Sequence, residues 1–168
     1  FIQASVSGAC NTLVTAPCCA NAKIATFTGP GSFTVTAAAL CAANNIVSHL
    51  IVAGGGSGGT GCSGGGAGAG GFREVKSPIT PYTASPLDGY STPANRVTVT
   101  AQTYAIVVGG GAPGQATAPN SCNSDGTRGN NSSFGGIIST GGGAGGDGPA
   151  GPEGPGGSGG GGGHSSGS

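Results

Sequence analysis

The amino-acid sequence predicts an all-β protein, with a small antiparallel sandwich or jelly-roll-like core that carries polyglycine II-like glycine-rich tracts. Three observations lead to this fold class. Forty of the 168 residues are glycine, and most lie in three tracts, 54–71, 109–114 and 141–163. The apolar residues occur in short runs rich in β-branched side chains, which favour strands. No window shows a sustained helical period with start and stop signals.

The first element, residues 1–22, is expected to be an extended arm. Its β-type fragments, 1–6 and 11–15, are interrupted by Gly8 and Pro17. The alternation of apolar and polar residues is too loose to indicate which face is buried. The arm could pair within its own subunit or with a neighbouring subunit.

The second element, residues 23–140, is expected to be a glycine-rich β domain that begins with a hairpin. Residues 23–28 and 32–36 mix apolar with small polar residues and flank the sequence Gly29-Pro30-Gly31. This pattern predicts two antiparallel strands joined by a tight turn. Residues 46–53, Ile-Val-Ser-His-Leu-Ile-Val-Ala, form the most continuous apolar run and predict a central strand.

The later strands of this domain follow a polar excursion. Prolines at positions 78, 81 and 86 break residues 73–90 into extended and turn segments. Residues 96–100 and 104–108 are both β-type, and they form either a hairpin or one bent strand. Residues 132–139 are the last strand candidate.

The glycine tracts have a three-residue period. Eight glycines occupy every third position from Gly142 to Gly163, and residues 55–70 keep the same frame with one lapse, at Ala67. Three residues make one turn of the polyproline II helix, in which only glycine fits where chains crowd together. A collagen-type triple helix, laterally packed polyglycine II helices and a flexible linker are all compatible with this period. We expect lateral packing, because strands interrupt the tracts; the third element, 141–168, is expected to be a period-three or flexible tail.

The charge of the chain excludes some classes of binding partner. Five basic and five acidic residues give a net charge of zero, so no basic face exists for nucleic-acid phosphates or anionic lipid. No stretch approaches the roughly 20 apolar residues of a membrane span. A surface with little charge favours association, which predicts a homo-oligomer. We therefore expect self-association, no nucleic acid and no membrane span.

Six cysteines form an even set in a chain with little core, which predicts a disulfide framework outside the reducing cytosol. Free or buried thiols are the alternative. A metal site is not expected, because there is no CxxC spacing and neither histidine has a partner at ligand spacing. The candidate disulfide cysteines are Cys10, Cys18, Cys19, Cys41, Cys62 and Cys122.

The chain shows no pattern for catalysis or cofactor binding. Residues 54–59 match G-x-G-x-x-G, but the residues that follow cannot sustain the helix that a pyrophosphate needs at its N-terminus. A serine nucleophile would need a base, and His49 lies inside the most apolar strand. We therefore expect no enzyme activity and no cofactor.

Two polar excursions are better candidates for function, because loops on a rigid scaffold often carry binding and tyrosines make adaptable contact surfaces. The alternative is an ordinary solvated connection. The candidate contact residues are Arg73, Glu74, Lys76, Tyr82 and Tyr90 in the first excursion and Asn123, Asp125 and Arg128 in the second.

The order of several motifs resembles the glycine-rich domain of tailed-bacteriophage structural proteins, as found in marine phages. The motifs are Gly-Ser-Phe-Thr-Val at 31–35, His-Leu-Ile-Val-Ala-Gly-Gly-Gly at 49–56, Gly-Gly-Phe-Arg-Glu at 70–74, Pro-Tyr-Thr-Ala-Ser-Pro-Leu at 81–87, Val-Thr-Val-Thr at 97–100, Tyr-Ala-Ile-Val-Val-Gly-Gly-Gly at 104–111 and Asn-Ser-Ser-Phe-Gly-Gly-Ile-Ile-Ser-Thr-Gly-Gly-Gly at 131–143. The resemblance covers residues 24–163. It implies a virion surface component of tail fibre or adhesin type that presents loops to a host-cell receptor, beside other virion proteins and in a trimeric or helical assembly.

The chain departs from this family in two respects. Members commonly end with a further apolar strand, which is missing here; with the absence of methionine, this leads us to expect a piece of a longer protein. The cysteines of the N-terminal arm also fall outside the resemblance. The competing hypothesis is a secreted filament or sheath subunit of a cell that assembles by β-strand exchange. Both hypotheses place the protein on a virion surface or outside the cell.

Overall fold

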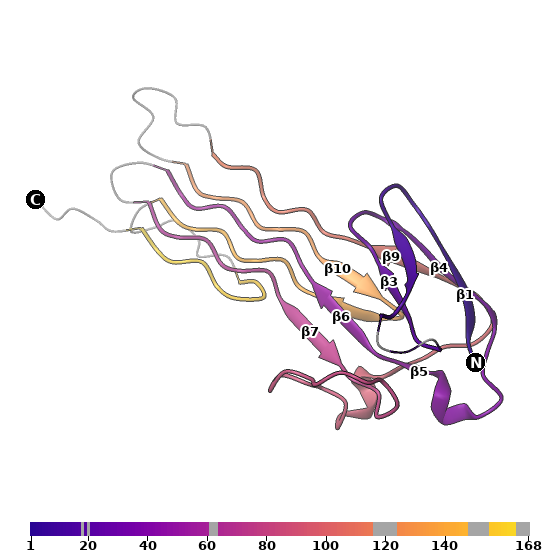
Figure 1. The fold of residues 1–168 in the computed structure, drawn as a ribbon. Coiled ribbons are helices and arrows are strands. Elements are labelled where there is room, and N and C mark those ends of the chain that lie inside the picture. Colours follow the sequence, from indigo (N-terminus) through magenta and orange to yellow (C-terminus); the bar gives the residue numbers. More distant parts are fainter. Residues whose placement is uncertain (18, 20, 61–63, 116–123, 148–154, 164–168) are drawn as a thin grey trace, which may run out of the picture. The chain divides into compact units, whose positions relative to one another are not determined.

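The computed structural model describes residues 1–17, 19, 21–60, 64–115, 124–147 and 155–163. The chain is all-β, as expected, and its other regular elements in the described part are two short 3-10 helices, η1 (Ala42–Asn45) and η2 (Pro93–Asn95) (Figure 1). It divides into two compact units. Unit 1 comprises residues 1–51, 73–108 and 133–137, and unit 2 comprises residues 52–72, 109–132 and 138–168. The three-part division expected from the sequence stays a prediction.

The strands form one five-stranded sheet, in the order β1-β4-β9-β10-β11, and three two-stranded ladders, β2-β3, β5-β8 and β6-β7. The pairs β1–β4, β4–β9, β9–β10, β2–β3 and β5–β8 are antiparallel. Strand bounds are β1 (Gln3–Ser7), β2 (Thr12–Thr15), β3 (Lys23–Thr26), β4 (Gly31–Ala37), β5 (Ile46–Val47), β6 (His49–Val52), β7 (Phe72–Val75), β8 (Val97–Thr98), β9 (Thr103–Val107), β10 (Ser132–Phe134) and β11 (Ile137–Ser139).

The expectation that residues 29–31 form the turn of a hairpin is wrong. β3 and β4 do not pair with each other: β4 pairs with β1 and β3 pairs with β2, so the N-terminal arm and residues 23–37 form one long, bent, two-stranded ribbon. The bend is stabilised by Asn11, whose amide donates to the carbonyl of Ser7 (2.8 Å) and accepts from the N–H of Thr28 (3.1 Å). The arm therefore pairs within its own chain, and Gly29-Pro30-Gly31 lies at a corner.

Two other strand expectations also change. Residues 96–100 and 104–108 form neither a hairpin nor one bent strand, because β8 pairs with β5 whereas β9 pairs with β4 and β10. The expected last strand is two strands, β10 and β11, separated by Gly135 and Gly136. Both glycines have positive φ angles, 58° and 86°, which suits the type I′ turn of a two-residue hairpin.

The apolar core of unit 1 is small and valine-rich. Val35, Val97 and Val99 are buried, and partly buried apolar side chains pack against them. The Phe134 ring contacts the rings of Phe33, His49 and Tyr104 edge-on, at centroid distances of 6.0, 6.0 and 5.9 Å, an arrangement that aromatic pairs prefer. The core residues packed around the valines are Ile2, Ala4, Phe33, Val47, Tyr104, Phe134 and Ile137.

Unit 2 is held together by hydrogen bonds between the backbones of its glycine segments. Segment 53–60 donates to segment 65–71 at every third residue, and the residues one position further along donate to segment 124–130. The first series is Ala53, Gly56 and Gly59 to Gly71, Gly68 and Gly65, each at 3.0 Å, and the second is Gly54, Ser57 and Thr60 to Asn130, Thr127 and Ser124, at 3.0, 2.9 and 2.9 Å. Three residues make one turn of a polyproline II-type helix, so successive positions bond to different neighbours.

The same period joins the remaining glycine segments. Segment 140–146 accepts from 65–71 in an antiparallel register and donates to 53–60 in a parallel one, and segment 157–161 lies beside both 140–146 and 65–71. This is the laterally packed polyglycine II arrangement expected from the sequence, and segments of a single chain form it, whereas a collagen-type arrangement needs three chains. Residues 157–161 belong to this bundle, whereas the end of the tail, 164–168, lies outside the described residues.

Candidate functional site

Glu74 holds the first polar excursion in place. We define the contact loop as residues 76–96, which follow β7. Glu74 lies on β7 and is 8% exposed; its Oε2 accepts from the N–H of Ser85 (3.1 Å) and from the Ser85 hydroxyl, and its backbone carbonyl accepts from Gly89 (2.9 Å). Charge-assisted hydrogen bonds of this kind compensate the cost of burying a carboxylate. Glu74 therefore fixes the conformation of the contact loop through hydrogen bonds from its buried position.

Tyr82 is tied to the same carboxylate. Burial, the negative charge of Glu74 and the hydrogen bond to its carboxylate raise the pKa of Tyr82 above 10.0, with a smaller contribution from Asp88 and an opposing one from Ser48. The hydroxyl therefore stays protonated as a donor. Tyr82 as a whole is still 41% exposed, so part of this residue is available at the surface.

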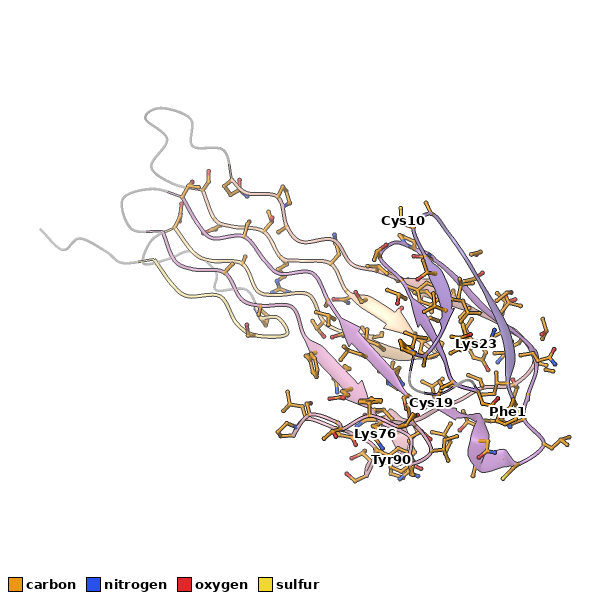
Figure 2. All side chains as sticks on the ribbon, viewed as in Figure 1. Phe1, Cys10, Cys19, Lys23, Lys76 and Tyr90 are labelled. Atoms are coloured by element: carbon orange, nitrogen blue, oxygen red, sulfur yellow. The ribbon has the colours of Figure 1, made fainter. Side chains whose placement is uncertain are left out.

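Asp88 brings the two ends of the contact loop together. Its Oδ1 accepts from the N–H of Lys76 (2.9 Å) and from the N–H of Tyr90 (3.0 Å). Each of these residues belongs to a cation–aromatic pair. The Lys76 ammonium lies 5.9 Å from the Tyr82 ring centroid, and the Arg96 guanidinium carbon lies 4.2 Å from that of Tyr90. One carboxylate oxygen thus accepts a backbone hydrogen bond from one residue of each pair. Figure 2 shows Lys76 and Tyr90 in the contact loop.

The arginine and two apolar residues complete the surface of the loop. Arg96 Nε donates to the carbonyl of Tyr90 (2.7 Å), which orients the guanidinium over the ring. Ile79 and Leu87 are 60% and 68% exposed. The loop thus combines two cations, two aromatic rings and two exposed aliphatic side chains on a backbone held by the buried Glu74 and the half-buried Asp88, an arrangement suited to binding.

The predicted contact residues divide between the units. Arg73, Glu74, Lys76, Tyr82 and Tyr90 all lie in unit 1; Arg73 is exposed on β7, whereas the Glu74 carboxylate points into the loop. Ser85, Asp88 and Arg96 were not among the predicted contact residues. The Asp-Gly pair at 88–89 is a turn signal that could have indicated Asp88, but no local pattern connects Arg96 to Tyr90.

The second group of predicted contact residues belongs to unit 2. Asp125 Oδ1 accepts from the N–H of Asp147 (3.1 Å), and Arg128 is exposed. Asn123 lies outside the described residues. For all eight residues a role in contacts stays a prediction.

His49 is part of the core of unit 1. Its ring packs against Phe134, and both ring nitrogens are shielded from solvent without a hydrogen bond. Burial lowers the pKa of His49 below 6.5, with an opposing effect from the backbone of Val47. The side chain is therefore neutral at physiological pH.

The cysteines show no cross-link among themselves where they are described. Cys10 and Cys41 are exposed thiols and Cys19 is half-buried, while Cys18, Cys62 and Cys122 lie outside the described residues. The disulfide framework stays a prediction. Among the described residues, no group of three or more histidine, cysteine, aspartate or glutamate side chains is placed to hold a metal ion, and no helix has the length and apolar character of a membrane span.

Comparisons with known proteins identify the family. Searches of curated proteins and of solved structures gave no match. The family model described as a glycine-rich domain matches residues 27–168, which include both the period-three segments and the contact loop. This chain therefore belongs to the glycine-rich domain family.

Proposed function

We propose that this protein is a structural, non-enzymatic component of a virion surface, of tail fibre or adhesin type, in which the contact loop serves host attachment. The observation that carries the proposal is the construction of this loop. Glu74 and Asp88 fix its backbone through hydrogen bonds, while Lys76, Tyr82 and Leu87 stay accessible. A loop ordered before binding loses less conformational entropy when a partner binds.

The architecture of unit 2 supports a structural role. Its glycine segments bond to one another through the backbone at every third residue, so the bundle is ordered without a large apolar core. Lateral hydrogen bonding of this kind suits a stiff part of a fibre. The motif order that resembles phage structural proteins runs through both the bundle and the strands of unit 1.

The proposed partners are further copies of this chain in a trimeric or helical assembly, other virion proteins and a host-cell receptor. The alternative, a cellular filament built by strand exchange, gains no support from β1. This strand already pairs with β4 of the same chain along Gln3–Ser7, so exchange would first require that ladder to open.

The proposal is tested by locating the protein. Antibodies against the purified chain should label purified phage particles in electron microscopy, and peptides of the chain should be found by mass spectrometry of those particles. The purified chain should also reduce phage adsorption to host cells. Labelling of secreted filaments on cells that carry no phage would contradict the proposal, as would turnover of a substrate by the purified chain.

A further inference from the structure

The two units carry opposite formal charges although the whole chain is neutral. Unit 1 contains four basic and two acidic residues, a net charge of +2, whereas unit 2 contains one basic and three acidic residues, a net charge of −2. The basic residues of unit 1 are Lys23, Arg73, Lys76 and Arg96, and its acidic residues are Glu74 and Asp88. Three of the four cations therefore lie on β7 or the contact loop.

The acidic residues of unit 1 accept hydrogen bonds within the fold, and one of them, Glu74, is buried. Glu74 is 8% exposed and accepts hydrogen bonds from Ser85 and Tyr82. Asp88 Oδ1 is occupied by two backbone N–H groups. Lys76 and Arg96 lie over tyrosine rings instead, and Arg73 is exposed. With Glu74 buried, the accessible charges of β7 and the contact loop are those of Arg73, Lys76, Arg96 and the half-buried Asp88, so positive charge is in excess.

We propose that the contact loop binds an anionic polysaccharide, whose carboxylate or sulfate groups pair with Lys76 and Arg96 while its sugar rings pack against Tyr82 and Tyr90. This inference rests on the proposed function and specifies the chemistry of the receptor. Arginine binds planar oxyanions through two parallel hydrogen bonds. Tyrosine offers a large, rigid surface with a polar end at little entropic cost.

The small number of cations, each lying over a tyrosine ring, favours a polysaccharide over duplex nucleic acid. A duplex-binding protein typically neutralises about 6–10 phosphates, many more than the loop could. A uronic acid polymer such as alginate places a carboxylate on each sugar, beside the apolar face of the ring. Two separate cation–aromatic pairs, held through one Asp88 oxygen, repeat this combination within one loop.

The first test measures binding of the whole purified chain to alginate and to dextran sulfate, with neutral dextran as the control. We expect binding to both anionic polymers and none to dextran, and weaker binding as salt rises from about 0.02 M to 0.2 M because the charges are screened. Lys76→Gln should weaken binding about fivefold. Lys23→Gln, which removes the same charge from β3, outside the contact loop, should leave binding unchanged and is the matched control.

The second test uses Asp88, whose two roles can be separated. Asp88→Asn removes a negative charge but keeps an oxygen that can accept from Lys76 and Tyr90, so binding to alginate should tighten about twofold to fivefold. Asp88→Ala removes the acceptor as well, so the loop loosens and binding should weaken. A role in stability alone would predict no gain for Asp88→Asn. Circular dichroism should show that each variant is folded.

Three outcomes would overturn the inference. They are unchanged binding in both Lys76→Gln and Asp88→Asn, duplex DNA binding as tightly as alginate, and loss of host-cell binding in Leu87→Ser but in no charge variant, which would indicate an apolar protein partner. These outcomes can be distinguished from a failure of the proposed function. If the chain is found in phage particles and blocks adsorption but ignores anionic polysaccharides, only the inference about the receptor is lost.

Discussion

A pair of glycine-to-alanine substitutions two positions apart tests whether backbone packing, rather than glycine content, stabilises unit 2. The Gly68 N–H donates to the carbonyl of Gly143 (2.9 Å), and its own carbonyl accepts from Gly56 (3.0 Å). A Cβ added at Gly68 would lie closer than 3.0 Å to backbone atoms of Ser158, Gly143 and Gly159. No side chain can rotate to make room, so a segment must move.

The expected magnitude follows from three contributions. Overpacking costs about 1–3 kcal/mol, and one or two weakened hydrogen bonds add about 1 kcal/mol each. Alanine lowers the conformational entropy of the unfolded chain, which offsets about 0.4–1 kcal/mol of this loss. Gly68→Ala should therefore lower the free energy of unfolding by about 1–4.5 kcal/mol. Gly66→Ala is the matched control: a Cβ there meets nothing within 4 Å, so stability should stay unchanged or rise by up to about 1 kcal/mol.

The assay combines urea unfolding with amide hydrogen exchange. In Gly68→Ala the amides of Gly56 and Gly68 should exchange faster, because their bonds to Gly68 and Gly143 are disturbed. In Gly66→Ala these amides should keep their protection. If both variants lost the same stability, or neither lost any, the close packing of the glycine segments would be refuted. Failure of Gly68→Ala to fold beside a folded Gly66→Ala would agree with the reasoning.

Three further predictions concern unit 1, each measured by urea unfolding. Burial lowers the pKa of His49, so the folded state binds fewer protons than the unfolded state, and the contribution of this residue to stability should be complete above pH 6.5 and lost as the pH falls below it. A His49→Phe variant with the same pH dependence would contradict this. Phe134→Ala removes the ring that contacts three others and should cost about 3 kcal/mol, so a loss below about 1 kcal/mol would show that the ring is not central. Asn45→Ala leaves the buried N–H and carbonyl of Ala39 without their side-chain partners (2.7 and 3.0 Å) and should lower the free energy of unfolding by about 2–4 kcal/mol. A near-neutral result would mean that water replaces the amide.

Local patterns in the sequence predicted most strand positions correctly. β1, β2, β3, β4 and β9 coincide with runs whose composition favours strands, and β5 and β6 divide the run at 46–53. The three-residue glycine period predicted the bundle, because backbone packing needs glycine at regular positions whichever neighbour it meets. The excursion expected at 73–90 was recognisable from its prolines, tyrosines and charges, but its first residues, 73–75, belong to strand β7, which was not predicted. These features depend on residues close together in the chain.

Strand pairing and the construction of the contact loop were decided only by the tertiary structure. Gly29-Pro30-Gly31 is compatible with a hairpin turn, but β3 pairs with β2 and β4 with β1, because pairing partners are selected by packing over long sequence separations. Likewise, no local pattern placed Lys76 and Tyr90 on one oxygen of Asp88. The sequence by itself determined which segments extend and where glycine is needed; the tertiary structure determined which segments meet, because those contacts join residues that are distant in the chain.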